Sequence, residues 1–195
     1  MHFIIEGSKL VVFLFLLIIA QACSRASMSS IDTYAGKTLY LQNNIHAQIG
    51  PRDTKASYAN WTDPGLGHII VPVNTPVEIG KYIRGLTIKN LSDGRLIFFE
   101  YNARNMGISA EQYIPFITSS SKIDLNIYSE VDQEGIKNGK ALVGMSKEGV
   151  QTALGYPAAH QTPSLKNNSW MYWRNRWNTK VVEFDTDGKV KINQY

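Results

Sequence analysis

Five short runs of alternating apolar and polar residues between positions 37 and 102 constrain this fold more than any other feature. The runs are KTLYLQN, GHIIVPV, PVEIGKYI, LTIKNL and RLIFFEYN. Alternation with period two, as at Leu39 and Leu41, is typical of strands with one buried face. Asp93-Gly94, between the last two runs, favours a hairpin turn because glycine readily adopts positive φ. Five short strands in about 65 residues predict a small all-β barrel or sandwich. The stretch from Gln48 to Gly67 is expected to be a long polar loop with Trp61 in its middle.

Helical spacing replaces period two from residue 109 onward. SAEQYIPFI reads as a short helix, in which Ser109 and Gln112 have the spacing of a capping box and Pro115 restricts the length. A second helix is predicted to begin at Ser129, where Asp132 occupies the matching position.

The last third of the chain predicts a helix followed by three strands. In GMSKEGVQTALGYP, Ser146 is a good helix cap and Gly155 a good terminating residue, and residues 150, 153 and 154 share one face. The runs SWMYWR, KVVEFD and KVKIN follow as strands. We therefore predict an α+β chain: a small all-β barrel or sandwich, then a helix plus an antiparallel three-stranded meander. The barrel-like domain, with a short helix, is expected at residues 35–136 and the α+β module at 137–195.

An apolar run of eleven residues, Leu10 to Ala20, precedes the only cysteine, Cys23. The run is shorter than the roughly 20 residues that span a bilayer and suits a secretory signal. We predict a signal peptide at residues 1–22 and a flexible tether at 23–34, so cleavage would leave 173 of the 195 residues. A buried amino-terminal helix is the alternative, although the run is apolar on every side.

Composition sets the remaining bounds. A hydrophobic content of 44% and a charged content of 18% exclude a disordered chain. One cysteine excludes an internal disulfide framework and a zinc site with several thiolates. A net charge of +4 is too mild to indicate a nucleic-acid partner.

The stretch IIAQACS resembles the signal of a bacterial lipoprotein. The resemblance implies that Cys23 becomes the first mature residue and carries acyl chains such as palmitate. Ser24 follows it where aspartate would indicate inner-membrane retention, so the resemblance implies the periplasmic face of the outer membrane. An ordinary signal peptide with a free cysteine nearby is the alternative.

The last third also resembles a family of outer-membrane lipoproteins, the BamE/SmpA/OmlA family. The pattern is G-M-S-x-x-x-V-x-x-x-L-G-x-P, then W-x-Y, V-x-F and G-K-V, carried by Gly144, Met145, Ser146, Val150, Leu154, Gly155, Pro157, Trp170, Tyr172, Val182, Phe184, Gly188 and Val190. The resemblance covers roughly residues 139–192 and implies a non-enzymatic protein, since founding members are accessory subunits of the barrel-assembly machinery. Those members lack a counterpart to residues 35–125, which resemble, more weakly, small Src-homology-type barrels of bacterial envelope proteins.

The segment from Lys166 to Lys180 interleaves aromatic and basic residues. As a strand, it would bury one face and expose the other to a protein, a glycan or lipid head groups. Core packing with incidental charge is the alternative, and nucleic acid is not expected. The residues we predict to contact a partner are Trp170, Tyr172, Trp173, Arg174, Arg176 and Trp177.

No motif predicts catalysis, a metal site or a cofactor. His46, His68 and His160 lack partner histidines at metal-binding spacing, and surface or capping roles are expected for them. Asp185 and Asp187 favour a hairpin turn over a calcium loop. We therefore expect a non-catalytic protein-binding module in envelope assembly or maintenance, tethered to the membrane by its lipid. A peptidoglycan-binding envelope or stress lipoprotein is the alternative, and a periplasmic hydrolase with a dispersed triad is the third.

Overall fold

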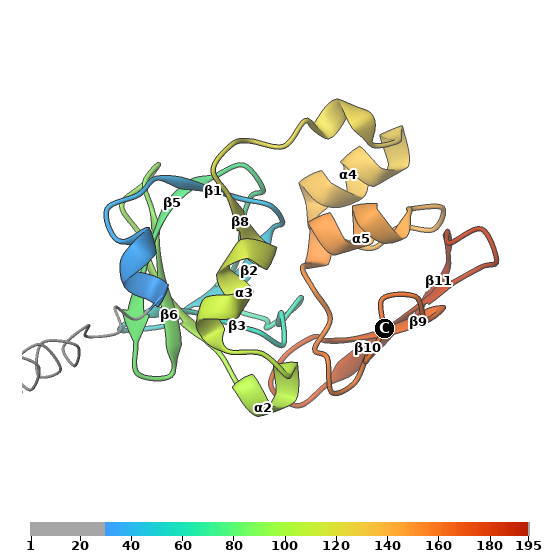
Figure 1. Cartoon of the computed structure of the whole chain (residues 1–195). Coiled ribbons are helices and arrows are strands. Elements are labelled where there is room, and N and C mark those ends of the chain that lie inside the picture. The colour runs from blue at the N-terminus through green and yellow to red at the C-terminus, as the bar shows by residue number, and fades with distance from the viewer. Residues whose placement is uncertain (1–29, 195) are drawn as a thin grey trace, which may run out of the picture.

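The computed structural model describes residues 30–194 and shows an α+β fold with two sheets (Figure 1). The predicted fold class is confirmed. The predicted signal peptide, Cys23 and most of the predicted tether lie outside the described residues. Residues from Ser30 to Tyr34 form a short 3-10 helix, η1, whose Ile31 is buried in the first core. No helix within residues 30–194 has the length and apolar character to cross a membrane.

The first module is an eight-stranded sheet that curls into a half-barrel (Figure 1). Its strands lie in the order β4-β2-β3-β7-β6-β5-β1-β8, and only the pair β3–β7 is parallel. The bounds are β1 (Leu39–Leu41), β2 (Ile45–Ile49), β3 (Thr54–Ser57), β4 (His68–Val71), β5 (Pro76–Tyr82), β6 (Gly85–Asn90), β7 (Leu96–Glu100) and β8 (Thr118–Ser119).

The strands bury alternate residues, as the sequence predicts: the side chains of Leu39, Leu41, Ile79 and Ile88 all belong to one apolar core. The helices α2 (Ala103–Met106) and α3 (Ala110–Ile117) follow β7, and α3 adds buried residues to that core.

Three of the eight strands, β2, β3 and β8, were not predicted, and part of the predicted polar loop is wrong. Residues 48–49 belong to β2 and residues 54–57 form β3. The sequence of β3, Thr-Lys-Ala-Ser, has little strand preference of its own. It pairs on both sides, antiparallel with β2 and parallel with β7, so tertiary pairing determines its conformation.

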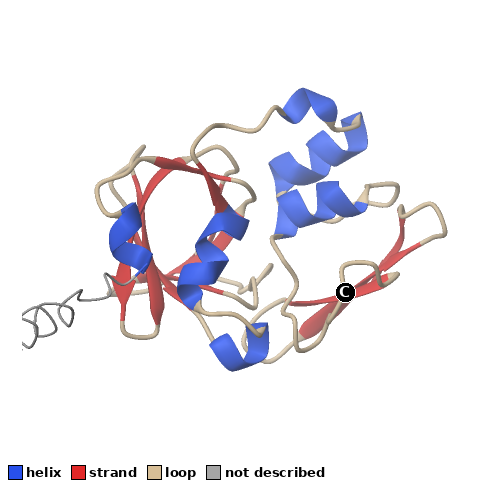
Figure 2. Ribbon diagram, in the orientation of Figure 1, coloured by secondary structure: helices blue, strands red, loops and turns tan. Residues whose placement is uncertain are grey.

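The second module places two helices on one side of a three-stranded antiparallel sheet (Figure 2). It contains η2 (Leu125–Ile127), α4 (Glu130–Asn138), α5 (Lys147–Leu154), β9 (Ser169–Trp173), β10 (Thr179–Phe184) and β11 (Val190–Gln194). The meander order β9-β10-β11 agrees with the prediction. The second core draws on residues 123–190 together with Val73, and the boundary predicted between residues 136 and 137 falls inside α4.

A buried carboxylate joins the starts of α4 and α5. Ser129 and Ser146 cap the two helices, as predicted. Asp132, only 3% exposed, accepts hydrogen bonds from the Ser146 backbone N–H at 2.7 Å and from the hydroxyls of Ser129 at 2.7 Å and Ser146 at 3.1 Å. Charge-assisted bonds of this kind are stronger than neutral ones, so Asp132 fixes the two helices against each other.

Candidate functional site at the seam between the modules

Polar side chains of the first module cap the carboxy-terminal end of α5. The last carbonyl groups of a helix have no partner within it. Here the Asn44 backbone N–H donates to the carbonyl of residue 152 at 2.8 Å. The carbonyl of residue 153 accepts from Asn44 Nδ2 at 3.2 Å and from His46 Nε2 at 3.0 Å. Asn60 Nδ2 donates to the carbonyl of residue 154 at 2.6 Å. Gly155 follows with φ of 81°, where a Cβ would lie 2.5 Å from Asn60 Nδ2. The two modules are therefore joined by directed hydrogen bonds.

A strained loop brings the first module against the edge of β9. Asn60 and Trp61 both have positive φ, 70° and 42°. Asparagine tolerates this conformation, but a bulky residue such as tryptophan adopts it only when its surroundings enforce it. After this turn, the backbone N–H groups of residues 62 and 63 donate to the carbonyls of residues 173 and 174 at 2.9 and 2.8 Å. We call this pairing the seam.

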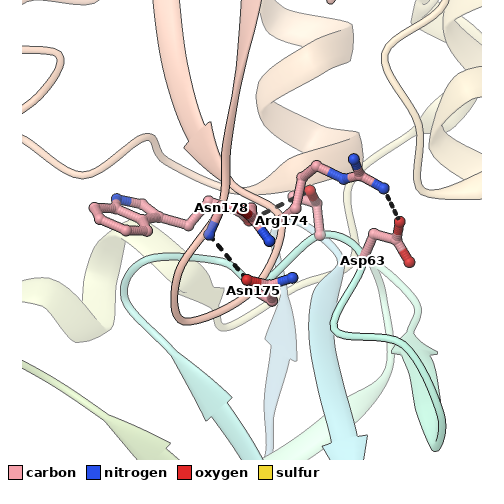
Figure 3. A network of polar contacts seen from close by, with 6 residues as sticks. Asp63, Arg174, Asn175 and Asn178 are labelled. Atoms are coloured by element: carbon pink, nitrogen blue, oxygen red, sulfur yellow. Dashed lines mark hydrogen bonds and ion pairs between the residues drawn. The ribbon is translucent and has the colours of Figure 1, made fainter. Parts of the chain in front are cut away.

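Polar contacts of Arg174, Asn175 and Asn178 hold the turn between β9 and β10 (Figure 3). Asn175 Oδ1 accepts hydrogen bonds from the backbone N–H groups of Trp177 and Asn178, both at 2.9 Å. Beside it, Arg174 Nη2 lies 2.8 Å from Asp63 Oδ2 of the first module. This contact lowers the pKa of Asp63. The turn is thereby fixed at its base, while Trp177 at its tip is 83% exposed.

A groove of about 510 Å³ lies where this turn meets the first module. One wall comes from β2, β3 and the loop between them. The others come from the loop at residues 60–64, which we call the seam loop, and from the β9–β10 turn. The lining residues are Gln48, Gly50, Pro51, Asp53, Lys55, Trp61, Pro64, Asn175, Arg176 and Trp177. The Arg176 guanidinium lies 5.4 Å from the centre of the Trp61 ring and 3.7 Å from a Glu100 carboxylate oxygen. Arg176 thus bridges the modules inside the groove.

The structure separates the six predicted partner residues into three groups. Trp170 and Tyr172 are 1% and 0% exposed and belong to the second core. We predicted that they contact a partner, but they are buried and cannot do so at the surface. They share the strand face that packs against α4 and α5, and Tyr172 Oη donates to the Gly155 carbonyl at 3.0 Å. Trp173 is half-buried.

The other predicted residues, Arg174, Arg176 and Trp177, lie at the seam or in the groove. Trp61 also lines the groove, and the sequence marked it only as an aromatic residue in a polar loop. Cys23 lies outside the described residues.

Two histidines that are 22 positions apart in sequence form a pair on the first module. The pairing of β2 with β4 makes His46 and His68 diagonal neighbours, with His46 Nδ1 3.1 Å from His68 Nε2. A carbonyl oxygen only accepts, so the bond to Ala153 places the hydrogen of the neutral His46 ring on Nε2 and makes Nδ1 the acceptor from His68.

The surroundings of this pair favour its neutral form. Burial lowers the pKa of His46 to about 4, against an opposing hydrogen bond to Ala153. Burial also lowers the pKa of His68, while the charge of Asp63 opposes that change. The sequence alone does not show that these two residues are close, because their proximity depends on the β2–β4 pairing.

Within residues 30–194, no group of three His, Cys, Asp or Glu side chains gathers closely enough to hold a metal ion. The groove instead offers an exposed indole and a guanidinium, two groups that contribute strongly to protein–protein binding. The chain matches no model of a protein family, no curated protein and no solved structure.

Proposed function

We propose that this chain is a lipid-anchored, non-catalytic lipoprotein of the outer membrane, and that its groove binds a segment of another envelope protein. The resemblance of IIAQACS to a lipoprotein signal supports the anchor at Cys23. The resemblance of the last third to accessory subunits of the barrel-assembly machinery supports a partner from that machinery. The observation that carries the binding role is Trp177, exposed at the mouth of a groove whose walls come from both modules.

The surroundings of Trp177 favour a protein segment with an apolar anchor. Trp and Arg are enriched among residues that dominate binding energy, and both lie in the groove at Trp177 and Arg176. Ile49, between the groove residues Gln48 and Gly50, is 43% exposed, and Leu66, two positions after Pro64, is 96% exposed. An apolar side chain of the partner would cover the exposed indole. An acidic residue beside it would meet the cations of Arg176 and Lys55.

The anchor would hold the groove close to the membrane. Ser30 lies seven positions after Cys23, so the chain between them reaches at most about 25 Å. From Ser30 the chain enters η1, which is tied to β5 by an ion pair of 2.8 Å between Asp32 and Lys81. Confinement of this kind raises the effective concentration of a weak binding surface near a membrane partner.

Photo-crosslinking in intact cells tests the binding role. A photoreactive residue placed at Trp177 should crosslink to an envelope protein, and Trp177→Ala should reduce co-purification of that protein at least tenfold, as for a binding hot spot. Ile83→Ala is the matched control, because Ile83 is an apolar side chain 96% exposed on the β5–β6 turn. Equal recovery with Trp177→Ala and the unmodified chain would contradict the proposal.

A second candidate ligand is peptidoglycan, which the polar part of the groove favours. Gln48, Asp53 and Asn175 supply the hydrogen-bonding groups that a glycan needs, beside the Trp61 ring. In that case the purified chain should sediment with sacculi, and Trp177→Ala should release it. If the chain does not sediment with sacculi but crosslinks to a protein at Trp177, the result excludes peptidoglycan and supports the protein partner.

The anchor is tested separately from the groove. Metabolic labelling with a fatty-acid precursor should mark the chain and be lost in Cys23→Ser, which should also leave the membrane fraction. The isolated Cys23→Ser protein should keep its groove and still bind the partner in solution. Label retained in Cys23→Ser would refute the anchor without affecting the binding role.

A further inference from the structure

A second pocket, of about 450 Å³, collects positive charge beside the seam. Its charged and titratable lining comes from five separate elements: Asp63, His68, Lys140, Arg174 and Lys180. Thr62 adds a hydroxyl, and the turn that ends α4 completes the wall. The groove that contains Trp177 shares none of these residues.

The cations of this pocket exceed its single carboxylate. Lys140, Arg174 and Lys180 carry three positive charges, and Asp63 carries one negative charge that already contacts Arg174. With the histidines neutral, the lining has a net charge of about +2. Lys180 is only 6% exposed, so part of this charge is held away from bulk water.

The cations of this pocket repel one another, and Lys180 shows the effect. Burial, and then repulsion from Arg174, lower the pKa of Lys180 to about 8, with a further contribution from Lys140. Asp63 opposes the change but does not cancel it. A bound anion would relieve this repulsion, because opposite charge stabilises the protonated form.

We propose that this pocket binds a phosphate group, with Lys140, Lys180 and Arg174 as the cationic donors and Thr62 as a hydroxyl donor. A dianionic phosphate matches the net charge of the lining, and ammonium and guanidinium groups are the usual partners of phosphate oxygens. The site goes beyond the protein-binding groove and does not depend on it.

The histidine pair makes the site stronger in acid. His68 borders the pocket and donates through Nε2 to His46, so a proton gained by His68 enters at Nδ1. This proton raises the net charge of the lining from about +2 to about +3. The groups that face this pair are Asp63 from the seam loop, Lys140 after α4, Arg174 from the β9–β10 turn and Lys180 from β10. Asp63 favours the added proton, while the three cations oppose it until an anion is bound.

NMR titration of the labelled full chain in a nonionic detergent tests the site. Inorganic phosphate should shift signals around residues 138–140 and 174 saturably, with a dissociation constant of about 1 mM or tighter. Lys140→Gln should weaken binding roughly tenfold, since it removes a charge-assisted contact. Lys180→Met should do the same if circular dichroism shows that it folds. Lys89→Gln is the control, because Lys89 on β6 pairs with Glu78 and lies outside the pocket lining.

Two further arms identify the source of the phosphate and the role of the histidine. Equal affinity for inorganic phosphate, glycerol phosphate and a short-chain phosphatidic acid supports recognition of the phosphate alone, and tighter binding of the phosphatidic acid identifies a lipid head group. Sulfate remains a dianion across the range, so its affinity should rise more between pH 7.5 and 5.5 in the unmodified chain than in His68→Gln. Absence of saturation below roughly 50 mM, or equal affinity in Lys140→Gln and Lys89→Gln, would overturn the proposal. Trp177→Ala should leave phosphate binding unchanged, which separates this result from the groove.

Discussion

Mild acid should destabilise this protein, and His46 accounts for a defined share of the loss. His46 is 2% exposed and bonded to Ala153 and His68, and burial lowers its pKa from 6.5 to about 4. The unfolded chain keeps the ordinary value, so between these two pH values the unfolded state binds more protons than the folded state. Stability from the neutral ring is therefore fully present above about pH 6.5 and is lost as the pH falls towards 4.

The size of this loss follows from the two pKa values. One pKa unit corresponds to about 1.4 kcal/mol, so the change from 6.5 to about 4 amounts to about 3 kcal/mol at full protonation. The lowered pKa of His68 adds to the loss in the same direction. A typical domain is stable by only about 5–15 kcal/mol, so a loss of this size is readily measured.

Equilibrium unfolding in urea, followed by tryptophan fluorescence at constant ionic strength, measures the effect at pH 7.5, 5.5 and 4.5. His46→Gln is the matched variant, because the amide Nε2 of glutamine can still donate to the Ala153 carbonyl but does not titrate. Carboxylates titrate in both proteins, so the difference between their pH profiles isolates His46. Between pH 7.5 and 4.5, the stability of the unmodified chain should fall by about 2.5 kcal/mol more than that of the variant, with unchanged m-values. Parallel pH profiles for the two proteins would refute the reasoning.

Three further predictions concern the polar contacts between elements and use the same unfolding measurement. Asn44→Ala should cost about 2–4 kcal/mol, because it leaves buried backbone groups of both modules unpaired, while the exposed Asn167→Ala should change stability by less than about 0.5 kcal/mol. Asp132→Ala should cost about 3 kcal/mol by removing the shared bonds at the starts of α4 and α5, while Glu130→Ala, exposed in the same helical turn, should cost far less. Gly149→Ala should cost about 1–3 kcal/mol, because the Cβ of alanine would overlap the buried Asp132 carboxylate. Near-equal values for any variant and its control, or a neutral Gly149→Ala, would contradict these assignments.

Elements governed by short-range interactions could be predicted from the sequence. The capping box at Ser109 and the caps at Ser129 and Ser146 lie where expected, because a hydroxyl bonds a backbone N–H only two or three residues away. Gly94 has φ of 75° in the turn between β6 and β7, as the Asp-Gly signal requires. The fold class follows from the same periodicities.

Elements governed by distant partners could not be predicted. The four residues of β3 are strand only because β2 and β7 bond them from both sides. In β9, period two divides the residues into two faces but does not say which face is buried. Trp170 and Tyr172 lie in the core because the α4–α5 pair covers their face, which depends on a connection outside the strand.

The candidate site depends even more on such long-range placement. The groove combines residues 48–64 with residues 175–177, which meet only because residues 62 and 63 pair with the edge of β9. Trp177 and Arg176 belong to the segment from Lys166 to Lys180, whose mixture of aromatic and basic residues is visible in the sequence. The facing wall of the groove comes from residues 48–64, a stretch that we expected to be a loop.

The seam determines whether both sites exist before a ligand arrives. If the modules separated, Asn60 and the end of α5 would lose buried hydrogen bonds, at a cost of about 1–3 kcal/mol for each group left unpaired. The modules should therefore stay docked in the free protein, and binding would not have to order them. It follows that loosening the seam, for example by Asn60→Ala, should weaken the Trp177 groove and the phosphate pocket together. Trp177→Ala and Lys140→Gln each change one site only, so a joint loss in Asn60→Ala would place the cause in the docking of the modules.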